Sequence, residues 1–326
     1  MELLLDFIEI ILGGAAVIYG ANIFTDGASA LARKLNVSEL VIGLTIVAFG
    51  TSMPEFFVSL TSALKGSADI AVGNVVGSNI VNALLILGLS AALAPIVIDK
   101  ETVKRDIPIA ILASLLLTVF SLKGIITRLD AGILLVGLCV FMYLTLHNDK
   151  KQKVPTVEAA FGDAEKPKVE MTLFKMIALI VGGLILLVVG SNIFVDSASD
   201  IALMWGVPES VVGLTIVAVG TSLPELLTSI VAARKGQSAM AIGNVVGSNI
   251  LNIFAILGIT GLITPLSSAG FTYVDMFMMT GSMILVWLFS FTRYTIERWE
   301  GILLSLVYVA YVAYLIIQTL NLSIIN

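Results

Sequence analysis

Long apolar stretches separated by short polar breaks make up most of this sequence. A helix needs about 20 apolar residues to cross the hydrocarbon core of a bilayer. Each stretch that reaches or approaches this length predicts a membrane-spanning helix. There are ten such stretches, at about residues 3–33, 38–64, 69–94, 105–123, 129–147, 172–203, 208–233, 239–263, 270–292 and 299–320. The pattern therefore predicts an all-α membrane protein with ten transmembrane helices.

A single polar segment divides the ten stretches into two groups of five. Residues 148–171 carry ten charged side chains, and a segment of this composition buries too little apolar surface to fold by itself. We expect it to be a solvated linker. It would join a first five-helix unit, residues 1–147, to a second one, residues 172–326.

The composition supports a membrane protein and excludes several other classes. Hydrophobic residues make up 58% of the 326 residues and charged residues 13%, whereas a soluble domain is about half apolar and a quarter charged. The single cysteine, Cys139, excludes a disulfide within the chain and a zinc cluster. The net charge of −5 leaves no basic face for nucleic acid. The lone His147 is expected to be a solvated residue at the end of a span.

The positive charges are distributed unequally between the two sides of the predicted membrane. Fifteen of the 18 Lys and Arg residues fall on the side that holds the linker, and only Lys65, Lys123 and Arg128 fall on the other. Positive residues accumulate on the cytoplasmic side of membrane proteins. We therefore expect a cell-membrane protein with a cytoplasmic 148–171 linker and both termini outside.

Residues 43–90 and 213–260 resemble one another along their whole length. They align without a gap at an offset of 170 and share 28 of 48 residues. Five spans is an odd number, so the second copy must enter the membrane upside down relative to the first. Two inverted five-helix repeats are typical of secondary transporters, whose substrates bind near the midplane where the repeats meet.

Each copy also carries a carboxylate deep within an apolar span. The sequence GTSMPE at 50–55 recurs as GTSLPE at 220–225. A charge at the bilayer centre costs roughly 2.5–3.5 kcal/mol on insertion scales. Glu55 and Glu225 therefore need a compensating role, which favours transport over a duplication that serves packing alone.

The prolines next to these glutamates predict broken helices. Pro54 and Pro224 lack an amide hydrogen and clash with the preceding turn, so carbonyls such as those of Ala48 and Ala218 should become available. Irregular backbone at membrane depth is tolerated where it lines a cavity. Hydroxyls three and four residues before each glutamate should face the same point. They belong to Thr51, Ser52, Thr221 and Ser222.

The next span of each copy offers a second polar wall. Its polar residues are spaced by four and so form one stripe on a helix. They are Asn74, Ser78 and Asn82 in the first copy and Asn244, Ser248 and Asn252 in the second. Asn74 and Asn244 suit interhelical hydrogen bonding and ion contact equally. Asp26 and Asp196, another symmetric pair, are better explained by hydrogen bonds at a helix end or between helices.

These candidate groups offer oxygen ligands and lack His, Cys and Met. Such a set suits hard cations, since Ca²⁺ takes six to eight oxygens and Na⁺ is likewise hard. Two glutamates would neutralise one Ca²⁺. There is no arrangement of a nucleophile beside a base, so we expect neither an enzyme nor a cofactor.

At these motifs the sequence resembles the cation/Ca²⁺ antiporter superfamily, specifically its prokaryotic sodium/calcium exchanger branch. The resemblance covers essentially the whole chain and rests on the paired GTS-x-PE motifs, each followed by GN-x-x-GSN. It implies an antiporter that moves Ca²⁺ against Na⁺ by alternating access, with the first and sixth helices sliding across the other eight.

The resemblance also implies which residues bind the ions. Carried over to this chain, the ligands of the first half are Thr51, Ser52, Glu55, Ser78, Asn82 and the carbonyl of Ala48. Those of the second half are Thr221, Ser222, Glu225, Ser248 and the carbonyl of Ala218, with Asn252 at the position matching Asn82. Glu55 and Glu225 would hold the central Ca²⁺ and share in binding Na⁺.

One position departs from the family pattern. Archaeal members can carry Asp where this chain has Asn252, so one titratable carboxylate is lost and the stoichiometry stays open. A Ca²⁺/H⁺ antiporter is the alternative, because buried carboxylates also bind protons. A cation channel is a weaker alternative, since broken helices and inverted repeats also occur in channels.

Overall fold

The computed structural model describes residues 2–149, 171–207, 212, 216, 218–268, 272–291 and 293–325. Elements written η are π-helical turns. The first half contains α1 (Glu2–Leu35), α2 (Glu39–Ile42), η1 (Gly43–Val47), α3 (Ala48–Thr51), α4 (Met53–Leu64), α5 (Ala68–Ile80), η2 (Val81–Ile86), α6 (Leu87–Leu93), β1 (Ile96–Val97), η3 (Thr102–Asp106), α7 (Ile107–Ser121), β2 (Ile125–Ile126) and α8 (Arg128–Asp149). The second half contains α9 (Leu173–Met204), α11 (Ala218–Thr221), α12 (Leu223–Arg234), α13 (Ser238–Leu251), η6 (Asn252–Leu257), α14 (Gly258–Ile263), β3 (Leu266–Ser267), α15 (Tyr273–Ser290), β4 (Thr295–Ile296) and α16 (Arg298–Ile325).

The expectation of an all-helical membrane protein is confirmed. Among the described residues, seven helices are long and apolar enough to cross a membrane, and the bent pair Glu39–Thr51 and Met53–Leu64 makes an eighth. The expected span at 105–123 corresponds to α7, which has only 15 residues because the π-turn η3 occupies the preceding segment. The expected span at 208–233 lies partly outside the described residues. The count of ten therefore stays a prediction.

Two continuous segments form the centre of the bundle. One runs through α5, η2 and α6, and the other through α13, η6 and α14. In their apolar windows 72% and 83% of the residues are buried, against 17% and 22% for α1 and α9. Valines and isoleucines such as Val75, Ile80, Val245 and Ile250 are fully buried there. Of the candidate spans among the described residues, the two that carry the polar stripes are therefore the most buried.

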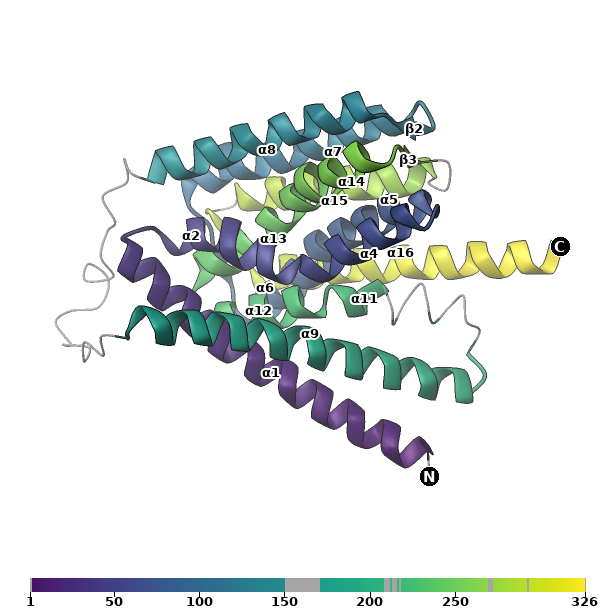
Figure 1. The fold of residues 1–326 in the computed structure, drawn as a ribbon, viewed down its shortest axis with the longest axis horizontal. Coiled ribbons are helices and arrows are strands. Elements are labelled where there is room, and N and C mark those ends of the chain that lie inside the picture. Colours follow the sequence, from purple (N-terminus) through teal and green to yellow (C-terminus); the bar gives the residue numbers. More distant parts are fainter. Residues whose placement is uncertain are drawn as a thin grey trace.

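The long helices α1 and α9 pack along one edge of the bundle, opposite α7 and α8 (Figure 1). Glycines make the contact between them. A Cβ added at Gly20 would lie 2.9 Å from the carbonyl oxygen of Gly183, and one added at Gly13 would lie 2.8 Å from that of Gly190. With 34 and 32 residues, each helix is about 50 Å long at about 1.5 Å per residue. They are longer than the bilayer core and run obliquely to the other helices.

Two short antiparallel sheets join the halves. Strand β1 pairs with β4, and β2 pairs with β3. Figure 1 also shows that the start of α1 and the end of α16 lie at one end of the bundle. The end of α8 and the start of α9, which flank the polar segment, lie at the opposite end.

Candidate ion-binding site

The first GTS-x-PE motif breaks its helix as its proline predicts. Helix α3 ends at Thr51, α4 begins at Met53, and the two segments differ in direction by 46°. Pro54 lies in the first turn of α4, where a missing amide hydrogen costs nothing. Ser52, between the two helices, has φ −82° and ψ 8°. These values lie in the sparsely populated bridge region, which is common at functional sites.

The second motif repeats this geometry. Helix α11 ends at Thr221 and α12 begins at Leu223, with Pro224 in its first turn. Ser222 has φ −90° and ψ 10°, close to the values at Ser52. Each break therefore places a serine at the joint and a glutamate one turn into the following helix.

The carbonyl of Ala48 is not freed by the break, contrary to our expectation. Its oxygen accepts the amide of Ser52 at 3.0 Å and lies 3.4 Å from the hydroxyl of Thr51. The reason is positional: Pro54 removes the donor that Gly50 would have received, whereas the donor for Ala48 is the intact amide of Ser52. A cation bound by Ala48 would have to share this carbonyl with the helix. Ala218 begins α11 at the equivalent position.

The two glutamates are buried, and each is bound by the serine of the opposite half. Both are 1% exposed. The Ser52 hydroxyl donates to Glu225 Oε1 at 3.0 Å, and the Ser222 hydroxyl donates to Glu55 Oε1 at 3.1 Å. The serine–glutamate contacts therefore cross between the two halves.

Two further serines from the polar stripes complete this cluster. The Ser78 hydroxyl donates to Glu55 Oε1 at 3.4 Å, and the Ser248 oxygen is hydrogen-bonded to that of Ser52 at 3.0 Å. One point in the bundle thus collects side chains from α4, α5, α12 and α13. Thr51 lies beside it and donates to Oδ1 of Asn244 at 3.1 Å.

Four buried oxygens, on the glutamate helices and on the π-turns that continue α5 and α13, have no hydrogen-bond partner. They are Oε2 of Glu55, Oε2 of Glu225, Oδ1 of Asn82 and Oδ1 of Asn252. In the described part of the chain, no Lys, Arg or His forms an ion pair with either glutamate. Burying acceptors without donors costs free energy. The arrangement is therefore suited to bound cations, which would supply the missing partners.

Asn74 and Asn244 form interhelical hydrogen bonds, one of the two roles expected for them. The Asn74 amide donates to the backbone oxygen of Glu55 at 3.0 Å and to the Ser59 hydroxyl at 2.9 Å. Asn244 repeats this with Glu225 and Ser229, at 3.3 and 2.9 Å. These bonds fix each glutamate helix against the polar stripe beside it.

Two buried asparagines that our sequence analysis did not single out also join the network. Asn79 and Asn249 are at most 1% exposed. They hydrogen-bond to Asn252 and Asn82, respectively, at 3.0 Å. The available signal was the GSN tripeptide, which recurs at the offset of 170.

Asp26 forms an interhelical ion pair, as expected. Its carboxylate lies 2.8 Å from Nζ of Lys235, which also donates to the backbone oxygen of Asn22 and the hydroxyl of Thr25. The contact joins α1 to the end of α12. Its counterpart Asp196 is exposed on α9. Neither aspartate belongs to the cluster of buried oxygens.

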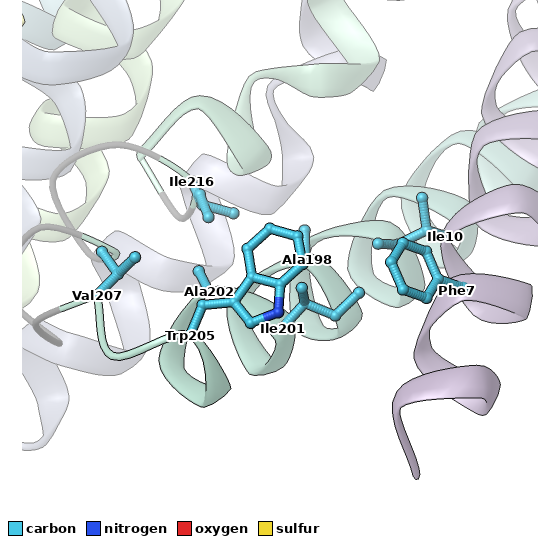
Figure 2. A pocket seen from close by; sticks show the side chains of 8 residues that line it. All are labelled: Phe7, Ile10, Ala198, Ile201, Ala202, Trp205, Val207 and Ile216. Atoms are coloured by element: carbon cyan, nitrogen blue, oxygen red, sulfur yellow. The ribbon is translucent and has the colours of Figure 1, made fainter. Parts of the chain in front are cut away.

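A separate apolar pocket of about 320 Å³ lies between the start of α1 and the end of α9. Figure 2 shows Phe7 and Ile10 on one side and Trp205 on the other, with the indole nitrogen of Trp205 as the one polar atom among the side chains drawn. This pocket offers no oxygen ligand, so it does not compete with the buried cluster as an ion site.

Comparisons with known proteins agree with this geometry. A model of the sodium/calcium exchanger protein family matches residues 6–147 and 175–317. The chain is 38% identical over 313 residues to the putative antiporter CaxA of Alkalimonas amylolytica, covering 95% of this chain and 98% of that protein. It is 35% identical over 344 residues to the sodium/calcium exchanger MaX1 of Methanosarcina acetivorans, covering 95% and 98%.

A solved structure carries the same fold. The sodium-calcium exchanger NCX_Mj, soaked with zero Na⁺ and Ca²⁺, matches with a TM-score of 0.81 and 34% identity, over 96% of this chain and 99% of that chain. These relatives are exchangers and antiporters. The expectation of a transporter, and not an enzyme, is therefore confirmed. Since the family model matches most of both halves, the chain belongs to the sodium/calcium exchanger family.

Proposed function

We propose that this protein is a secondary antiporter that exchanges Ca²⁺ for Na⁺ across the cell membrane by alternating access. The ions would bind near the midplane, between the two halves. The proposed ligands are the side chains of Thr51, Ser52, Glu55, Ser78, Asn82, Thr221, Ser222, Glu225, Ser248 and Asn252, with the carbonyls of Ala48 and Ala218. Coupled cation/Ca²⁺ transport is the activity named for the family's members.

The observation that carries the proposal is the crossed pair of serine–glutamate hydrogen bonds. It brings Glu55 and Glu225, which are 170 residues apart, to one buried point and leaves Oε2 of each without a partner. Two carboxylates balance the charge of one Ca²⁺. Hydroxyl and amide oxygens nearby raise the number of oxygen ligands toward the six to eight that Ca²⁺ prefers.

We further propose that the molecule consists of two inverted five-helix repeats, residues 1–147 and 172–326, joined by the 148–171 linker. The 170-residue offset relates β1 to β3 and β2 to β4, whereas the pairing joins β1 to β4 and β2 to β3. Such reciprocal pairing is what a two-fold axis between the halves produces. The two separate matches to the family model divide the chain at the same place.

The linker would face the cytoplasm and both termini the outside. Support comes from the fifteen Lys and Arg residues on the linker side. The start of α1 and the end of α16 lie at one end of the bundle, and the end of α8 and the start of α9 lie at the other (Figure 1). This arrangement is consistent with the proposed orientation.

The proposal is tested by measuring ⁴⁵Ca²⁺ uptake into proteoliposomes. Vesicles loaded with Na⁺ are diluted into Na⁺-free buffer, with the pH gradient collapsed by an ionophore. Uptake that requires internal Na⁺ supports the exchanger.

The second candidate function is Ca²⁺/H⁺ exchange. Among the described residues neither glutamate has a basic partner, so protons could provide the neutralising charge.

The two candidates give opposite results in the same vesicles. Uptake that follows an imposed pH gradient in the absence of Na⁺ would show that H⁺, and not Na⁺, drives transport. Unitary currents in planar bilayers without a counter-ion would indicate a channel and contradict both.

A further inference from the structure

The geometry points to Asn79 and Asn249 as positioning residues that determine which atom of the Asn252 and Asn82 side chains faces the transported cation. A primary amide has an oxygen that binds cations and an NH₂ group that repels them, and the two ends have nearly the same shape. An asparagine ligand therefore needs something that fixes its orientation. This inference rests on the proposed function, since it presupposes a cation at the buried cluster.

The orientation of Asn79 and Asn249 is set by backbone carbonyls. The Nδ2 group of Asn79 lies 3.1 Å from the backbone oxygen of Asn249, and Nδ2 of Asn249 lies 3.4 Å from the backbone oxygen of Asn79. A carbonyl oxygen only accepts hydrogen bonds. Each of these side chains must therefore present its NH₂ group to the opposite backbone, with no freedom to reverse.

The Oδ1 atoms of these two residues consequently point toward the ligand amides. Oδ1 of Asn249 lies 3.0 Å from Nδ2 of Asn82, and Oδ1 of Asn79 lies 3.0 Å from Nδ2 of Asn252. An acceptor at this place requires a donor, so Asn82 and Asn252 must turn their NH₂ groups away from the site. Their own Oδ1 atoms are thereby the free ends, and both are buried without a partner.

In each chain of contacts, a backbone carbonyl orients the first asparagine, and the oxygen of that asparagine orients the second. The oxygen of the second asparagine is then left free for a cation. The path crosses between the halves, because Asn79 of the first half orients Asn252 of the second, and Asn249 orients Asn82. Asn82 lies within the π-turn η2, and Asn252 begins the π-turn η6. Such turns are frequent at functional sites. Turn η2 packs against α12, which carries Glu225, and η6 packs against α4, which carries Glu55.

A purely structural role would leave a different pattern. Amides that only hold two helices together would satisfy both of their ends within the protein. Asn79 and Asn249 do so, and Asn249 also donates to the sulfur of Met283 at 3.1 Å. Asn82 and Asn252 do not, since the second end of each stays unsatisfied. Asn79 and Asn249 thus have both ends of the amide hydrogen-bonded, whereas Asn82 and Asn252 each keep an oxygen without a partner.

The test compares Asn79→Leu with Asn79→Asp in the full-length protein. Leucine is similar in size and removes the acceptor that orients Asn252, whereas a buried, protonated aspartate keeps an acceptor at that place and an O–H donor toward the backbone oxygen of Asn249. We expect Asn79→Leu to raise the Ca²⁺ concentration for half-maximal stabilisation, measured as the rise in melting temperature on adding CaCl₂, by about tenfold or more. Asn79→Asp should stay within about threefold of the wild type or bind more tightly. Ser268→Ala, which removes one buried hydrogen bond outside the site, serves as the control and should not change the Ca²⁺ response.

A double-mutant cycle separates positioning from simple stabilisation. If Asn79 acts through Asn252, then Asn79→Leu has no further effect on the Ca²⁺ response in an Asn252→Leu background, although it can still lower the melting temperature without ions. Equal effects of Asn79→Leu in both backgrounds would overturn the inference, and so would an unchanged Ca²⁺ response in the single variant. If Asn79→Leu does not fold, Asn249→Leu tests the same relation through Asn82. Failure of both to fold would assign the pair a structural role.

Measurements on the wild type distinguish failure of the proposed exchanger function from failure of the role inferred for Asn79. A wild-type protein that neither moves Ca²⁺ nor is stabilised by CaCl₂ would contradict the proposed function. A wild type that responds to Ca²⁺, beside an Asn79→Leu variant that responds equally, would contradict only the role of Asn79.

Discussion

The sharpest prediction concerns Glu55→Gln, because the surrounding hydrogen bonds dictate how the new amide must lie. Oε1 of Glu55 accepts from Ser222 at 3.1 Å and from Ser78 at 3.4 Å. The amide oxygen of a glutamine would take this place, since hydroxyl hydrogens already point there. Its NH₂ group would then occupy the position of Oε2, the atom that has no partner. The substitution would remove a charge and also direct two N–H donors at the cation.

The size of the effect follows from the lost charge. Two unit charges about 4 Å apart interact by about 4 kcal/mol at an effective dielectric constant of about 20. Since about 1.4 kcal/mol corresponds to tenfold in affinity, the loss of one contact weakens binding of a monovalent ion by roughly a thousandfold. For Ca²⁺ the electrostatic loss is larger. We therefore expect Glu55→Gln and Glu225→Gln to show no Ca²⁺ uptake at millimolar Ca²⁺.

The assay is ⁴⁵Ca²⁺ uptake into Na⁺-loaded proteoliposomes, with melting of the purified protein measured in parallel. Both variants should fold, because glutamine preserves the volume and the accepted hydrogen bonds. Glu101→Gln is the matched control, since this residue lies outside the cluster, 3.7 Å from Arg105. Exchange at wild-type affinity in either Glu55→Gln or Glu225→Gln would refute the reasoning.

Three other predictions concern the rest of the molecule. In a cysteine-free background, Lys65→Cys should react with a membrane-impermeant maleimide on intact cells, whereas Lys153→Cys should react only after lysis; the opposite result would reverse the proposed orientation. Gly20→Val would place Cβ 2.9 Å from the backbone oxygen of Gly183, so overpacking should lower stability by about 1–3 kcal/mol, and an unchanged melting temperature would contradict the tight crossing of α1 and α9. Asn74→Leu loses two interhelical hydrogen bonds and should lower the free energy of unfolding by about 1–3 kcal/mol, measured against denaturant, while stability equal to the wild type would show that these bonds are dispensable.

The sequence predicts much of this site because its signals are local and repeated. Glu55 and Glu225 stand out as charges in apolar spans, and Pro54 and Pro224 mark the breaks without reference to any other part of the chain. The gap-free alignment of residues 43–90 with 213–260 then shows that the two copies are related. The deep burial of both glutamates and the bend next to Pro54 are therefore predictable from the sequence.

The pairing of atoms is not predictable in the same way. Spacing along one helix predicts only that Ser52 and Glu55 face the same point, whereas the Ser52 hydroxyl donates to Glu225 of the other half. The orienting role of Asn79 depends on a backbone carbonyl 170 residues away. Neither contact leaves a periodic signal in the sequence, since both arise only when the two halves meet.

The two carboxylates also explain why the proposed transporter would exchange ions and not leak them. Without a bound cation or proton, Glu55 and Glu225 place two negative charges, each with one unpartnered oxygen, in the buried centre. Moving this empty site between the two sides of the membrane would carry uncompensated charge through a region where each such charge costs several kcal/mol. In the proposed mechanism one Ca²⁺, or the Na⁺ ions or protons that replace it, would supply the missing positive charge. Passage would then be favoured for the occupied site and suppressed for the empty one, which is the condition for obligatory exchange.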